Sequence, residues 1–170
     1  MPSRIWFATK KAGIAPLGSR SAVTLRGIQS IGITTTFNLE QVFELGQSAI
    51  YENIEGIPDI SVDIEKVLDG YSPVYTLATQ QGGGASLIGR ACAQCTLAVS
   101  VFSDACTNAS DAAVGVPNAE VHMSGLYVGS ISYAATVDGN ATESVTLVGN
   151  DKVWVGLAAG GTTNNQRKIN

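Results

Sequence analysis

Residues 33–70, ITTTFNLEQVFELGQSAIYENIEGIPDISVDIEKVLDG, decide the fold of this chain. In the second half of this stretch, Ile60, Val62 and Ile64 alternate with acidic residues and Ser61. This two-residue period is typical of a β-strand with one buried face and one solvated face. The pattern therefore predicts a strand whose polar face meets water or a charged polymer, and not a buried catalytic pocket.

The first half of the stretch alternates less regularly. Polar residues such as Thr34, Thr36, Glu40 and Glu44 interleave with apolar ones, and the pattern falters near Asn38. We expect a bulge or break at that point. The whole stretch is thus predicted to form two long strands joined by an acidic connection, with a turn at its end.

Length and composition predict one mainly β domain. A chain of 170 residues buries roughly 70% of its unfolded surface in a single domain. Charged residues make up only 14% of the chain, and Gly, Thr, Ser, Val and Ala are abundant, which favours strands over a helical bundle. The net charge of −4 disfavours wholesale electrostatic binding to nucleic acid. We therefore expect a mainly β fold.

Charge is unevenly distributed along the chain. Residues 1–26 hold five basic residues and no acidic one, whereas residues 40–69 hold eight acidic residues against Lys66 alone. Such a chain can complement a copy of itself head to tail, although both regions can equally be solvated surface. The basic residues are Arg4, Lys10, Lys11, Arg20 and Arg26.

Three regions are expected. Residues 1–26, rich in Pro and Gly, are predicted to form an extended arm with at most one short strand, residues 27–158 the β domain, and residues 159–170 a Gly/Asn-rich tail. No apolar run has the length of a signal peptide or a membrane span, so we expect folding in a cytoplasm and no membrane partner.

Shorter elements follow residue 70. Ser72 and Pro73 are typical of a helix start, and a second short helix is expected within residues 86–94. Residues 95–102 alternate as a strand, and Asp138-Gly139 between two alternating runs predicts a hairpin. A last strand is expected near Trp154.

Several phrases of the sequence occur in one order that resembles a known family. The phrases are residues 28–32 (IQSIG), 38–46 (NLEQVFELG), 50–52 (IYE), 67–70 (VLDG), 137–140 (VDGN) and 145–154 (VTLVGNDKVW). With these phrases, the chain resembles over about residues 20–155 the major tail tube proteins of tailed bacteriophages.

The resemblance implies an assembly. It implies a β-sandwich or barrel protomer with one or two short helices. Six such protomers would form each ring and close a continuous β-barrel, and rings would stack head to tail into a tube through which the genome passes. It also implies a virion tail location after assembly in the host bacterial cytoplasm, with sheath, baseplate and tail-terminator proteins as partners. Strand edges left unpaired in one protomer would be satisfied by neighbouring copies.

A lumen lined with carboxylates would repel phosphates, so DNA would pass without specific binding. The alternative is that the acidic side chains face outward or pair with the basic residues of an adjoining ring. The candidates for the lumen face are Glu40, Glu44, Asp59, Asp63 and Glu65.

Signals for catalysis, cofactors or metals are weak. His122 is the only histidine, and no serine lies in a nucleophile elbow. Residues 84–91 have the glycine spacing of a phosphate loop, but Arg90 and Ala91 replace the lysine and hydroxyl that hold phosphate and magnesium. The acidic residues lack the order of a calcium loop. We therefore expect no enzyme, no cofactor and no metal site.

Three cysteines, Cys92, Cys95 and Cys106, leave two readings open. Zinc would need a second ligand pair beyond the Cys92–Cys95 spacing. The residues are either small buried thiols or form disulfides between subunits once a particle leaves the reducing cytoplasm.

The other functional class considered is a β-sandwich binding module that recognises sugar or protein, as in a baseplate or adhesin. Such a module predicts an exposed aromatic platform, for which Tyr51, Tyr71 and Tyr75 are the available cluster. A hydrolase would need several titratable groups in one pocket, which the single histidine argues against.

Overall fold

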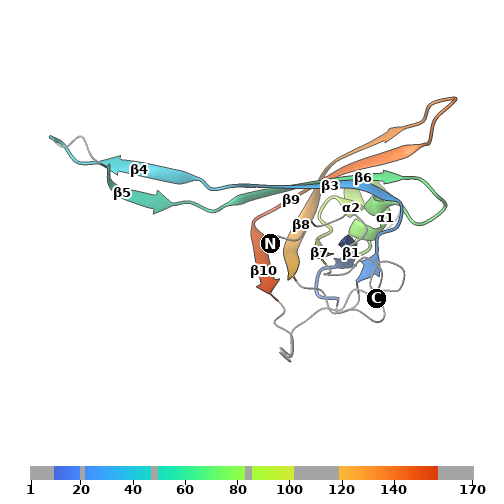
Figure 1. The fold of residues 1–170 in the computed structure, drawn as a ribbon, viewed down its shortest axis with the longest axis horizontal. Helices are drawn as coiled ribbons and strands as arrows, with labels where there is room; N and C mark the ends of the chain where they lie inside the picture. Colours follow the sequence, from blue (N-terminus) through green and yellow to red (C-terminus); the bar gives the residue numbers. More distant parts are fainter. Residues whose placement is uncertain (1–9, 20–21, 47–49, 83–85, 102–118, 157–170) are drawn as a thin grey trace, which may run out of the picture.

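The computed structural model describes residues 10–19, 22–46, 50–82, 86–101 and 119–156, which form a mainly β fold with two short helices (Figure 1). This confirms the predicted fold class. No helix in these ranges is long and apolar enough to cross a membrane. The elements are β1 (Lys10–Pro16), β2 (Val23–Thr24), β3 (Ile28–Thr36), β4 (Leu39–Phe43), β5 (Ile50–Glu55), β6 (Asp59–Val67), α1 (Val74–Ala78), α2 (Leu87–Arg90), β7 (Cys95–Val101), β8 (Ala119–Ala134), β9 (Thr142–Gly149) and β10 (Asp151–Gly156).

One long strand, β8, joins two parts of the main sheet. The strand order is β2-β1-β7-β8-β9-β6-β3, and β10 pairs with β8. We call the part built by β2, β1, β7, β10 and the start of β8 half-sheet A, and the part built by the end of β8, β9, β6 and β3 half-sheet B. Gly125, at φ 67°, lies in a bulge between them, where the register against β7 shifts. The bulge moves the inward face of β8 from Met123 to Leu126.

Both half-sheets enclose the same hydrophobic core. The alternation predicted for β6 is confirmed, because Ile60, Val62 and Ile64 are all buried. Their side chains belong to one cluster with Ile14 and Leu97 of half-sheet A and with side chains of α1. The core therefore fixes which face of half-sheet B is left outside.

The two-stranded sheet of β4 and β5, which we call the ribbon, extends away from the rest of the protein (Figure 1). β4 continues the direction of β3, and β5 leads back into β6. The break predicted near Asn38 is confirmed, since β3 ends at Thr36 and β4 begins at Leu39. The acidic connection predicted between two long strands is thus itself a hairpin.

Helix α1 begins one residue later than a Ser72 cap would place it. Its N-cap is Pro73, which offers no side-chain hydrogen bond. The carboxylate of Glu143 on β9 replaces the missing cap, because it accepts hydrogen bonds from the Val74 N–H at 2.7 Å and the Tyr75 N–H at 3.1 Å. Glu143 is fully buried, so a charge from another strand satisfies the helix N-terminus.

The amino-terminal region requires a correction. Residues 10–16 are not part of an extended arm but form β1, a strand between β2 and β7, with Ala12 and Ile14 in the core. Small residues in KKAGIAP hide the alternation, although they suit the interior of a sheet where space is limited. The rest of the division into three regions stays a prediction.

The carboxyl-terminal predictions agree well with the structure. The strand expected over residues 95–102 is β7, the hairpin is β8–β9, and the last strand is β10. The second helix is shorter than expected and covers only Leu87–Arg90, with Ser86 Oγ accepting the Gly89 N–H at 3.2 Å.

Candidate functional site

The face of half-sheet B that points away from the core carries small hydroxyl groups and carboxylates, and we call it the polar face. Strand register places these residues side by side: Asp63, for example, lies between Gly32 of β3 and Thr146 of β9. The polar face consists of Ser30, Gly32, Thr34 and Thr36 of β3, Asp59, Ser61, Asp63 and Glu65 of β6, Ser144, Thr146 and Val148 of β9, and Tyr127, Ser130 and Ser132 of β8.

The three carboxylates of the polar face accept hydrogen bonds from uncharged side chains. Thr146 Oγ1 donates to Asp63 at 2.7 Å, Ser30 Oγ to Glu65 at 3.4 Å, and Asn150 Nδ2 to Asp59 at 3.3 Å. Among the described residues, no Lys or Arg side chain forms a salt bridge with any of the three. The face therefore carries three carboxylates that have no ion-pair partner in the described part of the chain.

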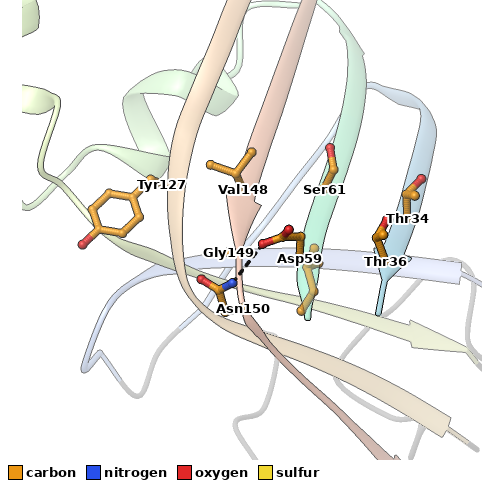
Figure 2. Close-up of a pocket in the computed structure, with 9 residues that line it drawn as sticks. Thr34, Thr36, Asp59, Ser61, Tyr127, Val148, Gly149 and Asn150 are labelled. Atoms are coloured by element: carbon orange, nitrogen blue, oxygen red, sulfur yellow. Dashed lines mark hydrogen bonds between the residues drawn. The ribbon is translucent and has the colours of Figure 1, made fainter. Parts of the chain in front are cut away.

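The polar face is hollowed where the strands approach the ribbon (Figure 2). This open hollow, of about 340 Å³, is lined by hydroxyls of Thr34, Thr36 and Ser61, the Asp59 carboxylate and the Tyr127 ring, among others. Its lining contains neither histidine nor cysteine. The hollow offers hydroxyl, amide and carboxylate groups to solvent or to a polar partner.

Two unpaired strand edges flank the polar face. On one side, β3 pairs only with β6, and on the other, residues 127–134 of β8 pair only with β9 in the described part of the chain. Each edge exposes backbone N–H and C=O groups that a strand of another chain can pair with. A four-stranded sheet with two such edges is able to extend in both directions.

The structure divides the candidate lumen residues into two groups. Asp59, Asp63 and Glu65 share the polar face, whereas Glu40 lies on β4 of the ribbon and Glu44 directly follows it. The main sheet ends at the break near Asn38, before Glu40. Alternation shows which side of a strand a residue faces but not to which sheet the strand belongs, so it could not separate the two groups. That the first three line a lumen stays a prediction.

The basic residues likewise occupy different elements. Lys10 and Lys11 lie in β1, and Arg26 follows β2, where its guanidinium stands 5.0 Å from the centre of the Tyr71 ring and Nη1 donates to Tyr71 Oη at 3.3 Å. Arg4 and Arg20 lie outside the described residues. A role of this set between rings stays a prediction.

The three tyrosines proposed as an aromatic platform lie in different parts of the fold. Tyr51 lies on β5 of the ribbon, whereas Tyr71 and Tyr75 follow β6 at the opposite end of half-sheet B. Arg26 covers one face of the Tyr71 ring. A sugar-binding platform built from these tyrosines stays a prediction.

The cysteines differ in exposure. Cys95 is fully buried in the core, and burial raises the pKa of its thiol to about 12. It cannot reach a neighbouring subunit without unfolding, which removes it from the candidate disulfide residues. Cys92 is exposed and stays a candidate, and Cys106 lies outside the described residues. The described residues contain no cluster of three His, Cys, Asp or Glu side chains for a metal ion.

Buried charged residues are the feature that sequence analysis missed. Besides Glu143, Lys66 is buried and donates to the Tyr71 and Ser72 carbonyls at 3.2 and 3.0 Å. Glu120 is buried as well and accepts from Ser100 Oγ at 2.7 Å, with His122 Nε2 at 3.0 Å. His122 thus contacts a buried carboxylate within the sheet. Lys66 and Glu143 lie in phase with the buried Ile64 and Val145, but a charged side chain is rarely fully buried, so their burial was not expected.

The sequence matches no protein-family model and no curated protein sequence. The fold, in contrast, is found in solved structures. A chain of the SPP1 tail tube structure aligns with a TM-score of 0.63 at 16% identity, covering 96% of this chain and 92% of that chain. A chain of the sheath/tube terminator of the PVC extracellular contractile injection system, in its extended state, aligns with a TM-score of 0.65 at 10% identity, covering 91% and 99%.

A chain of the PVC sheath-tube complex in its extended state aligns as well, with a TM-score of 0.61 at 10% identity over 92% of this chain and 95% of that chain. These alignments cover more than nine-tenths of both partners. The chain therefore has the fold of tail tube proteins, as the sequence resemblance led us to expect.

Proposed function

We propose that this protein is the structural protomer of a phage tail tube, in which six copies form a ring, rings stack head to tail, and the channel conducts genomic DNA during ejection. The observation that carries this proposal is the pair of unpaired edges flanking a polar, negatively charged face in a tail-tube fold. The role is structural and not catalytic.

The ring would close through the two edges. The β3 edge of one protomer would pair with residues 127–134 of β8 in the next, so that half-sheet B contributes four strands to a continuous barrel. Six protomers would supply about 24 strands, which at about 4.8 Å spacing and a tilt of about 40° enclose a barrel roughly 50 Å across. Side chains would narrow this bore, and a duplex would still fit.

The polar face would line the bore. The core occupies the other face of half-sheet B. In a closed barrel, the carboxylates of Asp59, Asp63 and Glu65 would therefore point either into the channel or to the outside of the tube. The inner assignment is favoured because half-sheet A and α1 cover the opposite face and would form the outer wall. Carboxylates and small hydroxyls would repel phosphates and offer DNA no cation to bind.

Ring stacking would use the ribbon. Apolar side chains on it are exposed although they lie in a regular strand pair, with 57% of Leu39 and 59% of Phe43 accessible. Exposed apolar groups on a projecting element are typical of a protein interface. Residues 39–55 contain four glutamates and no Lys or Arg, so a basic surface of the next ring, such as Lys10, Lys11 and Arg26, would complement them.

The tube would be part of the virion tail and would be assembled in the bacterial cytoplasm. Sheath, baseplate and terminator proteins are the expected partners, in keeping with the contractile injection systems whose chains share this fold. The exposed Cys92 would be free to cross-link neighbouring subunits under oxidising conditions.

Edge pairing is tested by proline in β3. Of two successive residues in an edge strand, only one directs its N–H away from the partner strand. Thr34→Pro and Thr35→Pro therefore differ: one variant loses a bond to β6 and unfolds more easily, and the other keeps its stability but loses an edge donor. We expect the stable variant to sediment as a protomer.

The measurement is analytical ultracentrifugation of both variants together with thermal unfolding. Rings formed by the stable variant as readily as by the natural chain would contradict pairing through β3. Proline at Ser132, on the other edge, provides a second variant if both β3 variants prove unstable.

A further inference from the structure

We propose that Asp59 is a positioning residue that fixes the direction in which the ribbon leaves half-sheet B, together with Asn38 and Asn150. We call these three residues the Asp59 bridge. The inference rests on the proposed function, because the direction of the ribbon matters only if the ribbon docks onto another ring. It assigns Asp59 a task beyond its charge on the polar face.

Asp59 accepts hydrogen bonds from two side chains that belong to different elements. Asn38, between β3 and β4, donates through Nδ2 to Asp59 Oδ2 at 3.0 Å. Asn150, between β9 and β10, donates through Nδ2 to Asp59 Oδ1 at 3.3 Å, the bond drawn in Figure 2. One carboxylate thereby ties the base of the ribbon to a strand connection that is not part of the ribbon.

The same two amides also hold the chain between β5 and β6. Asn38 Nδ2 donates to the Ile57 carbonyl at 3.0 Å, and Asn150 Nδ2 donates to the Pro58 carbonyl at 2.8 Å. These carbonyls belong to residues outside the strand ladders, so side chains supply the bonds that a neighbouring strand would otherwise make. Both sides of the ribbon's base are therefore anchored.

A close backbone contact completes the junction. The Gly56 N–H donates to the Asn38 carbonyl at 2.7 Å, and a Cβ at Gly56 would stand 2.5 Å from that oxygen. Only glycine allows this approach, so the two chain segments at the base of the ribbon are held in direct contact.

Small rotations at this base have large effects at the tip. Eight extended residues span about 26 Å, so a tilt of about 15° moves the end of the ribbon by roughly 7 Å. That displacement exceeds the spacing between neighbouring strands. Beyond the junction, β4 and β5 pair only with each other among the described residues, so the junction has to set the angle.

Asp63 provides a matched control for charge. It lies on the same face of the same strand, and Asn in its place still accepts the Thr146 hydroxyl through Oδ1. Asn in place of Asp59 cannot accept hydrogen bonds from both Asn38 and Asn150 in the same way, because its NH2 group would replace one of the two acceptor oxygens. Asp59→Asn and Asp63→Asn thus remove the same charge, but only the first disturbs the bridge.

The experiment compares Asp59→Asn, Asp59→Ala, Asn150→Ala and Asp63→Asn. In the protomer, the spread of distances between spin labels on Glu44→Cys and Val153→Cys, in a background with Cys92 and Cys106 replaced by Ser, reports the ribbon's direction. We expect a broader distribution for the first three variants and no change for Asp63→Asn. In assembly, the loss of two hydrogen bonds in Asp59→Ala should raise the concentration needed for tubes roughly tenfold.

A distribution for Asp59→Ala and Asn150→Ala as narrow as that of Asp63→Asn would overturn the proposal. Equal assembly of Asp59→Asn and Asp63→Asn, both weaker than the natural chain, would show that charge and not position is responsible. If the natural chain forms no tubes, the proposed function fails, whereas the distance measurement still decides whether the bridge directs the ribbon.

Discussion

A variant with Leu39→Ser and Phe43→Ser is expected to fold as the natural protomer does and to form no tubes. Both side chains are more than half exposed and lie outside the core, so their loss leaves the free energy of unfolding within about 0.5 kcal/mol. In a stacked ring, each buried Leu or Phe side chain would contribute about 1.5–3 kcal/mol. The loss is repeated in every protomer of a ring, which makes the effect on stacking large.

The matched control is Leu87→Ser with Ile88→Ser on α2. These side chains are also exposed, at 71% and 89%, but lie away from the ribbon. Electron microscopy and sedimentation of the two variants check the prediction. Tubes formed normally by the ribbon variant, or lost equally in both variants, would show that the ribbon is not the stacking element.

Glu143→Ala is expected to lower the free energy of unfolding by about 3 kcal/mol. The carboxylate is fully buried and accepts two backbone N–H groups of α1 as well as the Tyr133 hydroxyl at 3.2 Å. Its removal leaves these donors unsatisfied and leaves Lys66, its cross-strand neighbour, as a buried cation in the same region. The carboxylate also contributes, after desolvation, to the raised pKa of Tyr133.

Urea unfolding followed by tryptophan fluorescence measures this loss. Glu65→Ala is the control, because Glu65 is exposed on the polar face and accepts one long hydrogen bond at 3.4 Å. We expect the free energy of unfolding of that variant to fall by less than about 0.5 kcal/mol. A similar small effect for Glu143→Ala would mean that water or another group caps α1 equally well.

Local periodicity explains which parts of the fold could be predicted from the sequence. The strand of residues 59–67, the break near Asn38 and the hairpin at Asp138-Gly139 depend on neighbours in the chain, and all three are confirmed. β1 was missed because its small residues carry little hydrophobic signal. Its place in the sheet depends on β7, which lies about 80 residues further along.

The buried charges could not be predicted for a related reason. Glu143 and Lys66 lie at the ends of β9 and β6, in phase with the buried Val145 and Ile64, but charged side chains at strand ends are usually solvated. They are buried because α1 and the chain that precedes it cover that end of the sheet and need a carboxylate and an ammonium group as partners. A strand pattern describes the sheet and says nothing of what packs across its end.

The candidate site was predicted in part. Asp59, Asp63 and Glu65 lie on one face because the two-residue period is strict along β6. Glu40 and Glu44 were grouped with them because charge alone cannot show where the main sheet ends and the ribbon begins. The unpaired edges of β3 and β8 follow from the strand order, which no local pattern contains.

Electron microscopy of the purified natural chain, over a range of concentrations and with sedimentation in parallel, tests the central claim most directly. We predict rings of six protomers that stack into hollow tubes, with the β3 edge of each protomer joined to β8 of the next. A protein that stays a compact monomer at every concentration, with no ring or tube in any image, would contradict the claim.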